Sequence, residues 1–148
     1  MTTASQTLSE FAANLRYESI PPEVIERAKD CIIDTVAACT YGSQMPWTQI
    51  VIEHAKRNSA VGECSIFGTP VKVRAPFACL VNGASAHAFE LDALCEPSVG
   101  IHPGAALCVP GLAPSQGRKG NGKALLSAVV AGYEVLYRIG DAANQSIE

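Results

Sequence analysis

The chain has 148 residues, of which 48% are hydrophobic and 17% are charged, and its formal net charge at pH 7 is −3. This length and apolar content suit one domain with a buried core and exclude a disordered chain. The acidic balance, and the lack of any basic run longer than two residues, give nucleic-acid binding no electrostatic support.

No apolar run reaches the roughly 18 residues that a membrane helix needs. Residues 1–10 lack the basic start and the apolar core of a signal peptide, so a cytoplasmic protein without a membrane partner is expected. The sequence contains six cysteines: Cys31, Cys39, Cys64, Cys79, Cys95 and Cys108. Most fall within apolar helical patterns and none forms a C-x-x-C pair, which indicates free thiols rather than disulfides or a zinc site.

Helical periodicity dominates the first 58 residues. Apolar residues recur three and four positions apart in 5–16, 22–41 and 46–58, which predicts three amphipathic helices. Pro22 suits the first turn of the second helix, and Gly42 is expected to be its C-terminal cap. The side chains expected to face inward are Leu8, Phe11, Ala12, Leu15, Val24, Ala28, Cys31, Ile32, Thr35, Cys39, Ile50, Val51 and Ala55.

The middle of the chain changes character. Two short β-type runs, 64–67 and 71–73, are joined by Gly-Thr-Pro and predict a small hairpin. Residues 76–89 return to helix and are rich in Ala, Gly and Ser. Because small side chains let another helix approach closely, this helix is predicted to be central and buried. Residues 90–103 contain prolines and glycine in an irregular pattern, which predicts a loop.

The C-terminal third is predicted to be helical again. A short helix is expected over 104–113, although two prolines strain it, and a polar turn over 115–122. A last helix is expected from 122 to 139, with Gly140 as its cap. Its inward face is expected to contain Leu125, Leu126, Val129, Tyr133, Leu136 and Ile139. The predicted fold class is therefore all-α with one small β-hairpin.

Five ionisable side chains concentrate in residues 82–104: His87, Glu90, Asp92, Glu96 and His102. A structural role in the helix core, satisfied by a hydrogen bond, is the preferred interpretation of His87. Glu90 and Glu96 can be solvated, and Asp92 can cap a turn. His102 precedes Pro103, which holds it in an extended conformation. A histidine held in this way can transfer a proton near neutral pH.

Four stretches carry a resemblance to a known family. They are IPPEVIERAKDCIIDTVAA at 20–38, NGASAHAFELD at 82–92, HPG at 102–104 and AGYEVLYRIG at 131–140. Together, and in this order, they resemble the N-terminal part of the helical domain of the MmgE/PrpD family, which includes 2-methylcitrate dehydratases and cis-aconitate decarboxylases. Residues 1–148 are therefore interpreted as a portion of that domain.

The resemblance implies a large helical domain with a smaller α/β lid, an active site between the two, and a homodimer. It implies chemistry on small polycarboxylates by dehydration, decarboxylation or epimerisation. It also implies that no metal ion and no organic cofactor is needed.

The resemblance also assigns roles to three residues. His102 falls on the histidine of the family's His-Pro-Gly motif, which implies a proton donor or acceptor. Asp92 falls on the first acid of a paired-aspartate motif, which implies a catalytic partner, and Glu90 falls on an acidic, substrate-binding position two residues earlier. The match fails at 93–95, where Ala-Leu-Cys replaces a second aspartate, a frequent threonine and a histidine or aromatic residue.

Family enzymes are about three times as long as this chain, well beyond one domain. The lid, the basic residues that bind substrate carboxylates and the C-terminal helical segment are not expected within 1–148. The chain is therefore predicted to be a truncated, lyase-related protein that is inactive alone. The alternatives are isomerase or epimerase ancestry, an interaction fragment that pairs with a full-length relative or with itself, and an unrelated helical binding module.

One geometric expectation follows for the loop. Pro97, Gly100 and Pro103 should bend it and bring Asp92 close to His102 at the rim of a cleft, although ten residues separate them.

Overall fold

A computed structural model describes residues 2–96, 101–118 and 120–143. Its elements in chain order are α1 (Ala4–Asn14), the 3-10 turn η1 (Tyr17–Ser19), α2 (Pro22–Gly42), α3 (Pro46–Asn58), β1 (Val61–Ser65), β2 (Lys72–Val73), α4 (Ala75–Ala86), the π-helical turn η2 (Gly104–Cys108), α5 (Val109–Gly117) and α6 (Gly122–Ala143). The fold is mainly α with one small antiparallel sheet, as the sequence predicted. Within these ranges, no helix is both long and apolar enough to cross a membrane.

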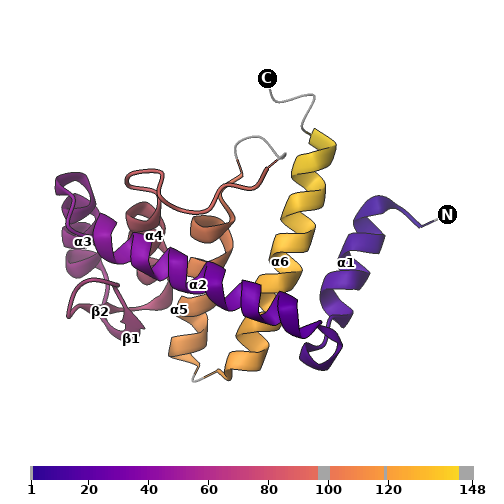
Figure 1. Cartoon of the computed structure of the whole chain (residues 1–148). Coiled ribbons are helices and arrows are strands. Elements are labelled where there is room, and N and C mark those ends of the chain that lie inside the picture. Colours follow the sequence, from indigo (N-terminus) through magenta and orange to yellow (C-terminus); the bar gives the residue numbers. More distant parts are fainter. Residues whose placement is uncertain (1, 97–100, 119, 144–148) are drawn as a thin grey trace.

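Helix α2 runs through the middle of the molecule (Figure 1). At one of its ends lie α3, the hairpin and α4, and at the other end lie α1 and α6. Each end has its own apolar cluster. The first is formed by Ile52, Ala55, Cys64, Ile66, Val73, Ala78, Val81 and Ala113. The second is formed by Ile20, Ile25, Ala28, Cys108, Val129 and Val130.

Helix α4 is central, as its small residues predicted. It packs against α2, α3, α5 and the hairpin. It comes very close to α2 at Gly42, where an added Cβ would overlap the backbone carbonyl of Ser85. The prediction that Gly42 caps α2 is wrong: α2 includes it, and Ser43 is the cap residue in right-handed helical conformation. The glycine is needed for helix–helix contact instead.

The predicted hairpin is confirmed and begins earlier than expected. Strand β1 starts at Val61, and its register with β2 is interrupted by a bulge between Val61 and Cys64. Asn82 fixes the hairpin to α4: its Nδ2 donates to the carbonyl of Ser65 at 2.9 Å, and its Oδ1 accepts from the backbone N–H of Phe67 at 3.0 Å. One buried amide thus satisfies two backbone groups that the short sheet leaves open.

Several predicted helix ends are wrong. Helix α4 ends at Ala86, three residues before the predicted end, and α5 continues to Gly117, into the region predicted as a turn. Pro110 is the second residue of α5, directly after the π-helical turn η2, and Pro114 lies inside α5, so neither proline ends the helix. Helix α6 continues past Gly140, which is buried inside it and is not a cap.

Some predicted inward faces are also wrong. Val24, Ile50 and Ile139 are exposed, Ile50 by 71%. The neighbouring residues Ile25 and Ile52 are buried in their place. Other residues of the predicted faces are buried as expected: Ala28, Thr35, Cys39, Ala55 and Val129.

Candidate functional site

Two histidines meet one buried carboxylate in the loop between α4 and η2. The Asp92 side chain is 0% exposed, and its Oδ1 lies 3.1 Å from Nδ1 of His87 and 3.4 Å from Nδ1 of His102. The two imidazole rings lie edge to face, with their centroids 4.6 Å apart. The structure therefore contains the expected approach of Asp92 to His102 and adds His87. We name these three residues the His–Asp–His cluster.

The end of α4 determines where His87 lies. Because the helix stops at Ala86, His87 is the cap residue, and its side chain is 47% exposed. The prediction of a structural histidine inside the helix core is therefore wrong. Glu90 then adopts a left-handed conformation with φ 53°, which reverses the chain. This reversal turns Asp92 back towards the end of α4, so that its carboxylate faces His87.

Gly104, two residues after His102, lies close to both α2 and Asp92. A Cβ at Gly104 would lie 2.7 Å from Oγ1 of Thr35 on α2 and 3.5 Å from Cβ of Asp92. The distance to Thr35 is too short for a Cβ unless that side chain moves, whereas the distance to Asp92 is an ordinary van der Waals contact, so glycine lets η2 begin close to α2. The backbone N–H of Cys95 donates to the carbonyl of Ile101 at 3.1 Å, which closes the loop. The bends expected at positions 97 and 100 lie outside the described residues.

The cluster has unused hydrogen-bonding capacity. Within the described residues, Oδ2 of Asp92 and Nδ1 of His102 are buried and have no hydrogen-bond partner. The 3.4 Å approach of His102 to Asp92 is therefore a close contact without hydrogen-bond orientation, and it is an ion pair only when the imidazole is protonated. Buried polar atoms without partners are costly. Such a cluster is suited to accept a ligand or a proton, and the side chain of His102 is 24% exposed and accessible to one.

A divalent cation is one ligand whose chemistry these donors suit. One ligand atom from each of His87, Asp92 and His102 lies within 4.8 Å of the others. Imidazole nitrogen and carboxylate oxygen are ligands that zinc takes in proteins. The same three groups can instead exchange a proton, since an imidazole is an acid or a base near neutral pH.

The other residues singled out from the sequence lie at the edge of the cluster. Glu90 is exposed on the turn between His87 and Asp92, and Glu96 is exposed further along the loop. Leu94, in the segment that departs from the family pattern, is also exposed. His87 was missed as a site residue because its position depends on where α4 ends, which its apolar pattern did not show.

A buried thiol lies beside the cluster. Cys39 on α2 is fully buried and its Sγ–H donates to the carbonyl of Asn82 at 3.2 Å. Burial, together with the nearby charge of Asp92, raises the pKa of the Cys39 thiol to about 12. Cys39 therefore stays protonated at neutral pH and is not a nucleophile of the site.

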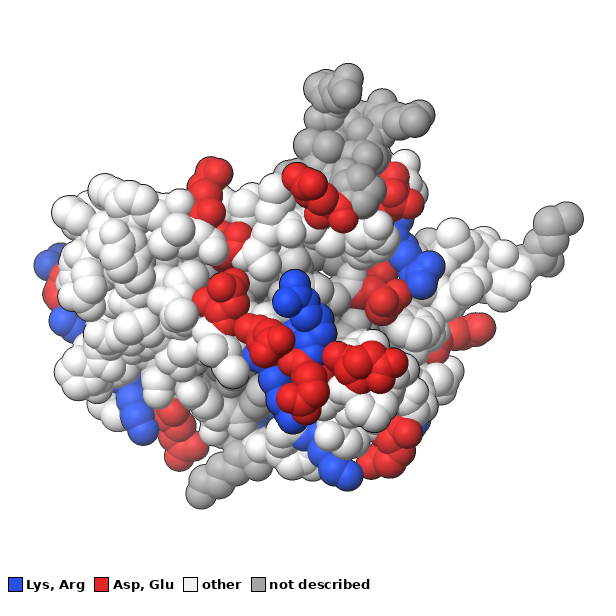
Figure 2. Space-filling view, viewed as in Figure 1, with Lys and Arg blue, Asp and Glu red and all other residues white. Residues whose placement is uncertain are grey.

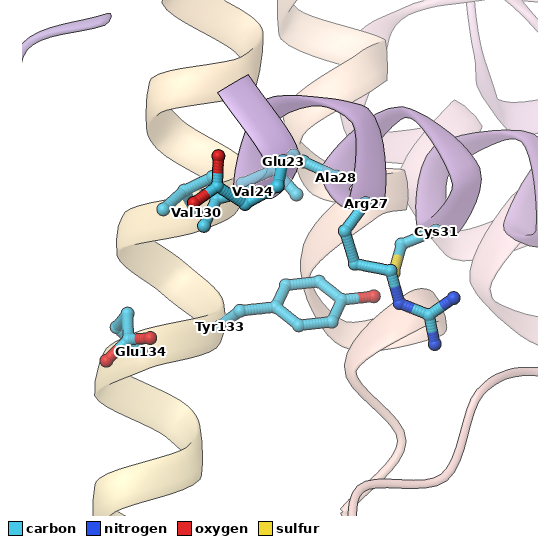
Figure 3. A pocket seen from close by; sticks show the side chains of 9 residues that line it. Glu23, Val24, Arg27, Ala28, Cys31, Val130, Tyr133 and Glu134 are labelled. Atoms are coloured by element: carbon cyan, nitrogen blue, oxygen red, sulfur yellow. The ribbon is translucent and has the colours of Figure 1, made fainter. Parts of the chain in front are cut away.

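Away from the cluster, a hollow of about 260 Å³ lies between α2 and α6 (Figure 3). The Tyr133 ring extends from α6 towards Cys31 and Arg27 on α2. Its hydroxyl lies 3.7 Å from Sγ of Cys108, and burial raises the pKa of both Tyr133 and Cys108. Figure 2 shows acidic and basic side chains intermingled across the middle of this face. The hollow thus offers no uniform charge for an anionic substrate.

Comparison with known proteins gives consistent results. Residues 6–147 match the MmgE/PrpD N-terminal domain. A cis-aconitate decarboxylase of Aspergillus terreus is 29% identical over 136 residues, which cover 89% of this chain and 28% of that protein. A cis-aconitate decarboxylase-like protein of Aspergillus oryzae is 29% identical over 143 residues, which cover 91% of this chain and 29% of that protein. No solved structure matches. The chain thus matches less than a third of the length of these relatives.

Proposed function

Because this chain belongs to the MmgE/PrpD family, we propose that its His–Asp–His cluster supplies the proton-transfer groups of a lyase-type site for small polycarboxylates. The observation that supports this most is the 3.4 Å approach of a fully buried carboxylate, Asp92, to a partly exposed imidazole, His102. The relatives named above as cis-aconitate decarboxylases indicate the substrate class. Glu90, on the exposed turn, is proposed to contact the substrate.

The chemistry needs a positioned acid or base. Removing CO2, or a proton, beside a carboxylate leaves an electron pair on carbon, and a new C–H bond forms when an acid delivers a proton to that carbon. In this proposal His102 carries the transferred proton. Asp92 is buried and anchored beside it, and its negative charge stabilises the imidazolium while His102 carries the proton.

We further propose that this chain does not turn over substrate alone. A substrate with two or three carboxylates needs cationic partners, because charge-assisted hydrogen bonds hold such groups most strongly. The described ion pairs of the cluster involve only histidine and aspartate, and the chain is acidic, with a net charge of −3. Purified chain incubated with cis-aconitate should release no CO2 and should show no new product by NMR.

A chimera tests the site itself. Residues 6–147 would replace the matching segment of the Aspergillus terreus decarboxylase, and decarboxylation of cis-aconitate would be followed. We expect activity that is lost in His102→Ala and Asp92→Asn and retained in His54→Ala, a control in an exposed histidine of α3. A folded chimera without activity, or an active one that is indifferent to His102→Ala, would overturn the assignment.

A second candidate function is pairing with another chain. The observation that favours it is the exposed apolar surface beside the cluster, which contains Phe89, Leu91 and Leu94. Contiguous exposed apolar surface is typical of interaction sites. If this surface pairs, the chain should self-associate, or bind a full-length relative, in sedimentation experiments. A compact monomer that binds no hydrophobic dye would contradict pairing.

A further inference from the structure

We infer that His87 is a positioning residue of the proposed site: its ring holds the Asp92 carboxylate in the orientation that faces His102. The inference gives His87 a role within the proposed lyase chemistry and therefore rests on that function for its meaning. The contact itself does not depend on any substrate, and it can be tested without one.

The geometry assigns different tasks to the two histidines. Both approach the same oxygen, Oδ1 of Asp92, but only the His87 contact, at 3.1 Å, is a hydrogen bond. The Nδ1 atom of His102 makes no hydrogen bond within the described residues. Asp92 is therefore anchored by His87 and only approached by His102. His102 keeps its bonding capacity for a substrate or a proton.

The hydrogen bond also fixes the protonation of the His87 ring. An ionised carboxylate only accepts hydrogen bonds, so Nδ1 of His87 must carry the hydrogen. In the neutral ring the lone pair is then on Nε2. This tautomer follows from the chemistry of the partner and gives the inference a spectroscopic signature.

Loss of His87 would leave the carboxylate poorly held. Oδ2 of Asp92 has no partner in the described part of the chain, so the bond from His87 is the hydrogen bond that defines its orientation there. Asp92 belongs to a loop, and the reversal at Glu90 fixes its backbone but not its side-chain torsion. The ring of His87 also lies edge to face with that of His102 and limits how that ring can tilt.

A cation bound by the same three residues is the alternative explanation of the cluster. A metal ligand must offer a lone pair, so a coordinating Nδ1 cannot carry a hydrogen. Because a histidine can also coordinate through Nε2, a hydrogen on Nδ1 of His87 supports the positioning role when the ring signals are unchanged by a chelator, whereas sensitivity to a chelator supports a metal site.

The experiment is NMR of the full chain with ¹⁵N-labelled histidine rings, recorded without substrate and with and without EDTA. We expect neutral His87 as the Nδ1–H tautomer and no change on adding EDTA. His87→Ala should shift the ring signals of His102, and His87→Asn should restore them, because the Asn Nδ2–H donates from nearly the same place. His54→Ala is the matched control and should leave the His102 signals unchanged.

A double-mutant cycle tests whether His87 acts through Asp92. In an Asp92→Asn background, His87→Ala should shift the His102 signals much less than it does in the original chain, since coupled residues are not additive. Equal shifts in both backgrounds, or unchanged His102 signals in His87→Ala, would overturn the inference. So would an Nε2–H tautomer of neutral His87. None of these outcomes bears on whether the chimera decarboxylates cis-aconitate, so the two proposals can fail separately.

Discussion

Helices α1 and α4 have nearly the same length, 11 and 12 residues, and opposite relations to the core. Helix α1 has the stronger local signals: a capping box between Thr3 and Gln6 and a regular apolar stripe, yet none of its residues is buried. Helix α4 has no side-chain cap and only a weak apolar stripe. Its buried residues are Ala78, Val81, Asn82, Ser85 and Ala86.

This difference shows that the features that form a helix are not the ones by which the helix stabilises the fold. Caps and periodicity decide whether a helix forms, and contacts with other elements decide how much it contributes to stability. Helix α4 contacts most of the elements around the first apolar cluster, whereas α1 packs against α6 at the edge of the molecule (Figure 1). Since His87 is the C-cap residue of α4, one member of the site directly follows the better-packed of the two helices.

The largest expected effect comes from Gly42→Ala, at the contact between α2 and α4. The added Cβ would overlap the Ser85 carbonyl, which is backbone and cannot rotate away. The helices must separate, so we expect the free energy of unfolding to fall by about 3 kcal/mol, measured by urea denaturation. The NMR signals of His87 should shift as well, because α4 positions that residue.

Gly83→Ala is the matched control within α4 itself. A Cβ at Gly83 would meet no atom within 4 Å. Alanine is the better helix former, so this variant should be more stable by roughly 0.5–1 kcal/mol. Equal destabilisation by the two substitutions would show that backbone conformation, and not the closeness of α2, controls the glycines of this region.

The next largest effect is expected at Asn82. Asn82→Ala removes both hydrogen bonds to the hairpin and leaves the carbonyl of Ser65 and the N–H of Phe67 without those partners. We expect a loss of about 2 kcal/mol in the free energy of unfolding, since buried groups left unpaired carry the desolvation cost. Asn14→Ala in α1 removes an exposed bond to the carbonyl of Glu10 and should change stability far less. Similar losses of stability in both variants would show that the hydrogen bonds of α1 contribute as much as those of α4.

The same distinction explains what the sequence could predict. The existence and order of the helices, the hairpin and the central place of α4 follow from periodicity and small-residue content. Which face becomes buried depends on partners distant in sequence, so Ile52 is buried where Ile50 was expected. Gly42 and Gly140 look like caps in the sequence because glycine suits both a cap and a close contact.

Part of the site could also be predicted from the sequence. Asp92 and His102 stand out through residue type, the neighbouring proline and the family resemblance, and the structure brings them together. His87 could not be assigned, because its exposure follows from α4 ending at Ala86. The left-handed turn at Glu90 could not be assigned either, since glutamate has no preference for that conformation.

A smaller effect is expected from alkaline pH, and it should come from the α2–α4 side of the molecule. The Cys39 thiol has a pKa raised from 9.0 to about 12 by burial first and by Asp92 second. Its contribution is fully present below pH 9 and is lost as pH rises through the interval from 9 to 12. At pH 10 the loss for this one group is about 1 kcal/mol.

Urea denaturation at pH 7 to 11 measures this loss. Cys39→Ser removes the titrating thiol and should flatten the pH dependence between 9 and 10 relative to the original chain. Half-buried Tyr133 and buried Cys108 also have raised pKa values, so a residual slope should remain. Helix α1 contains no cysteine or tyrosine, so it adds nothing to the loss of stability at alkaline pH. An unchanged slope in Cys39→Ser would contradict the assignment.

The smallest effect is expected at the cap of α1. The Thr3 side chain accepts a hydrogen bond from the backbone N–H of Gln6, and the backbone N–H of Thr3 donates one to Oε1 of Gln6. Thr3→Ala removes the first of these bonds, which in an integral helix costs about 1 kcal/mol. Because α1 buries no residue, its opening need not open the core. We therefore expect faster amide exchange confined to residues 4–14, with the global free energy of unfolding lowered by less than about 0.5 kcal/mol. A loss of global stability as large as that in Asn82→Ala would show that α1 and α4 unfold as one unit. The description of α1 as peripheral and α4 as central to stability would then be wrong.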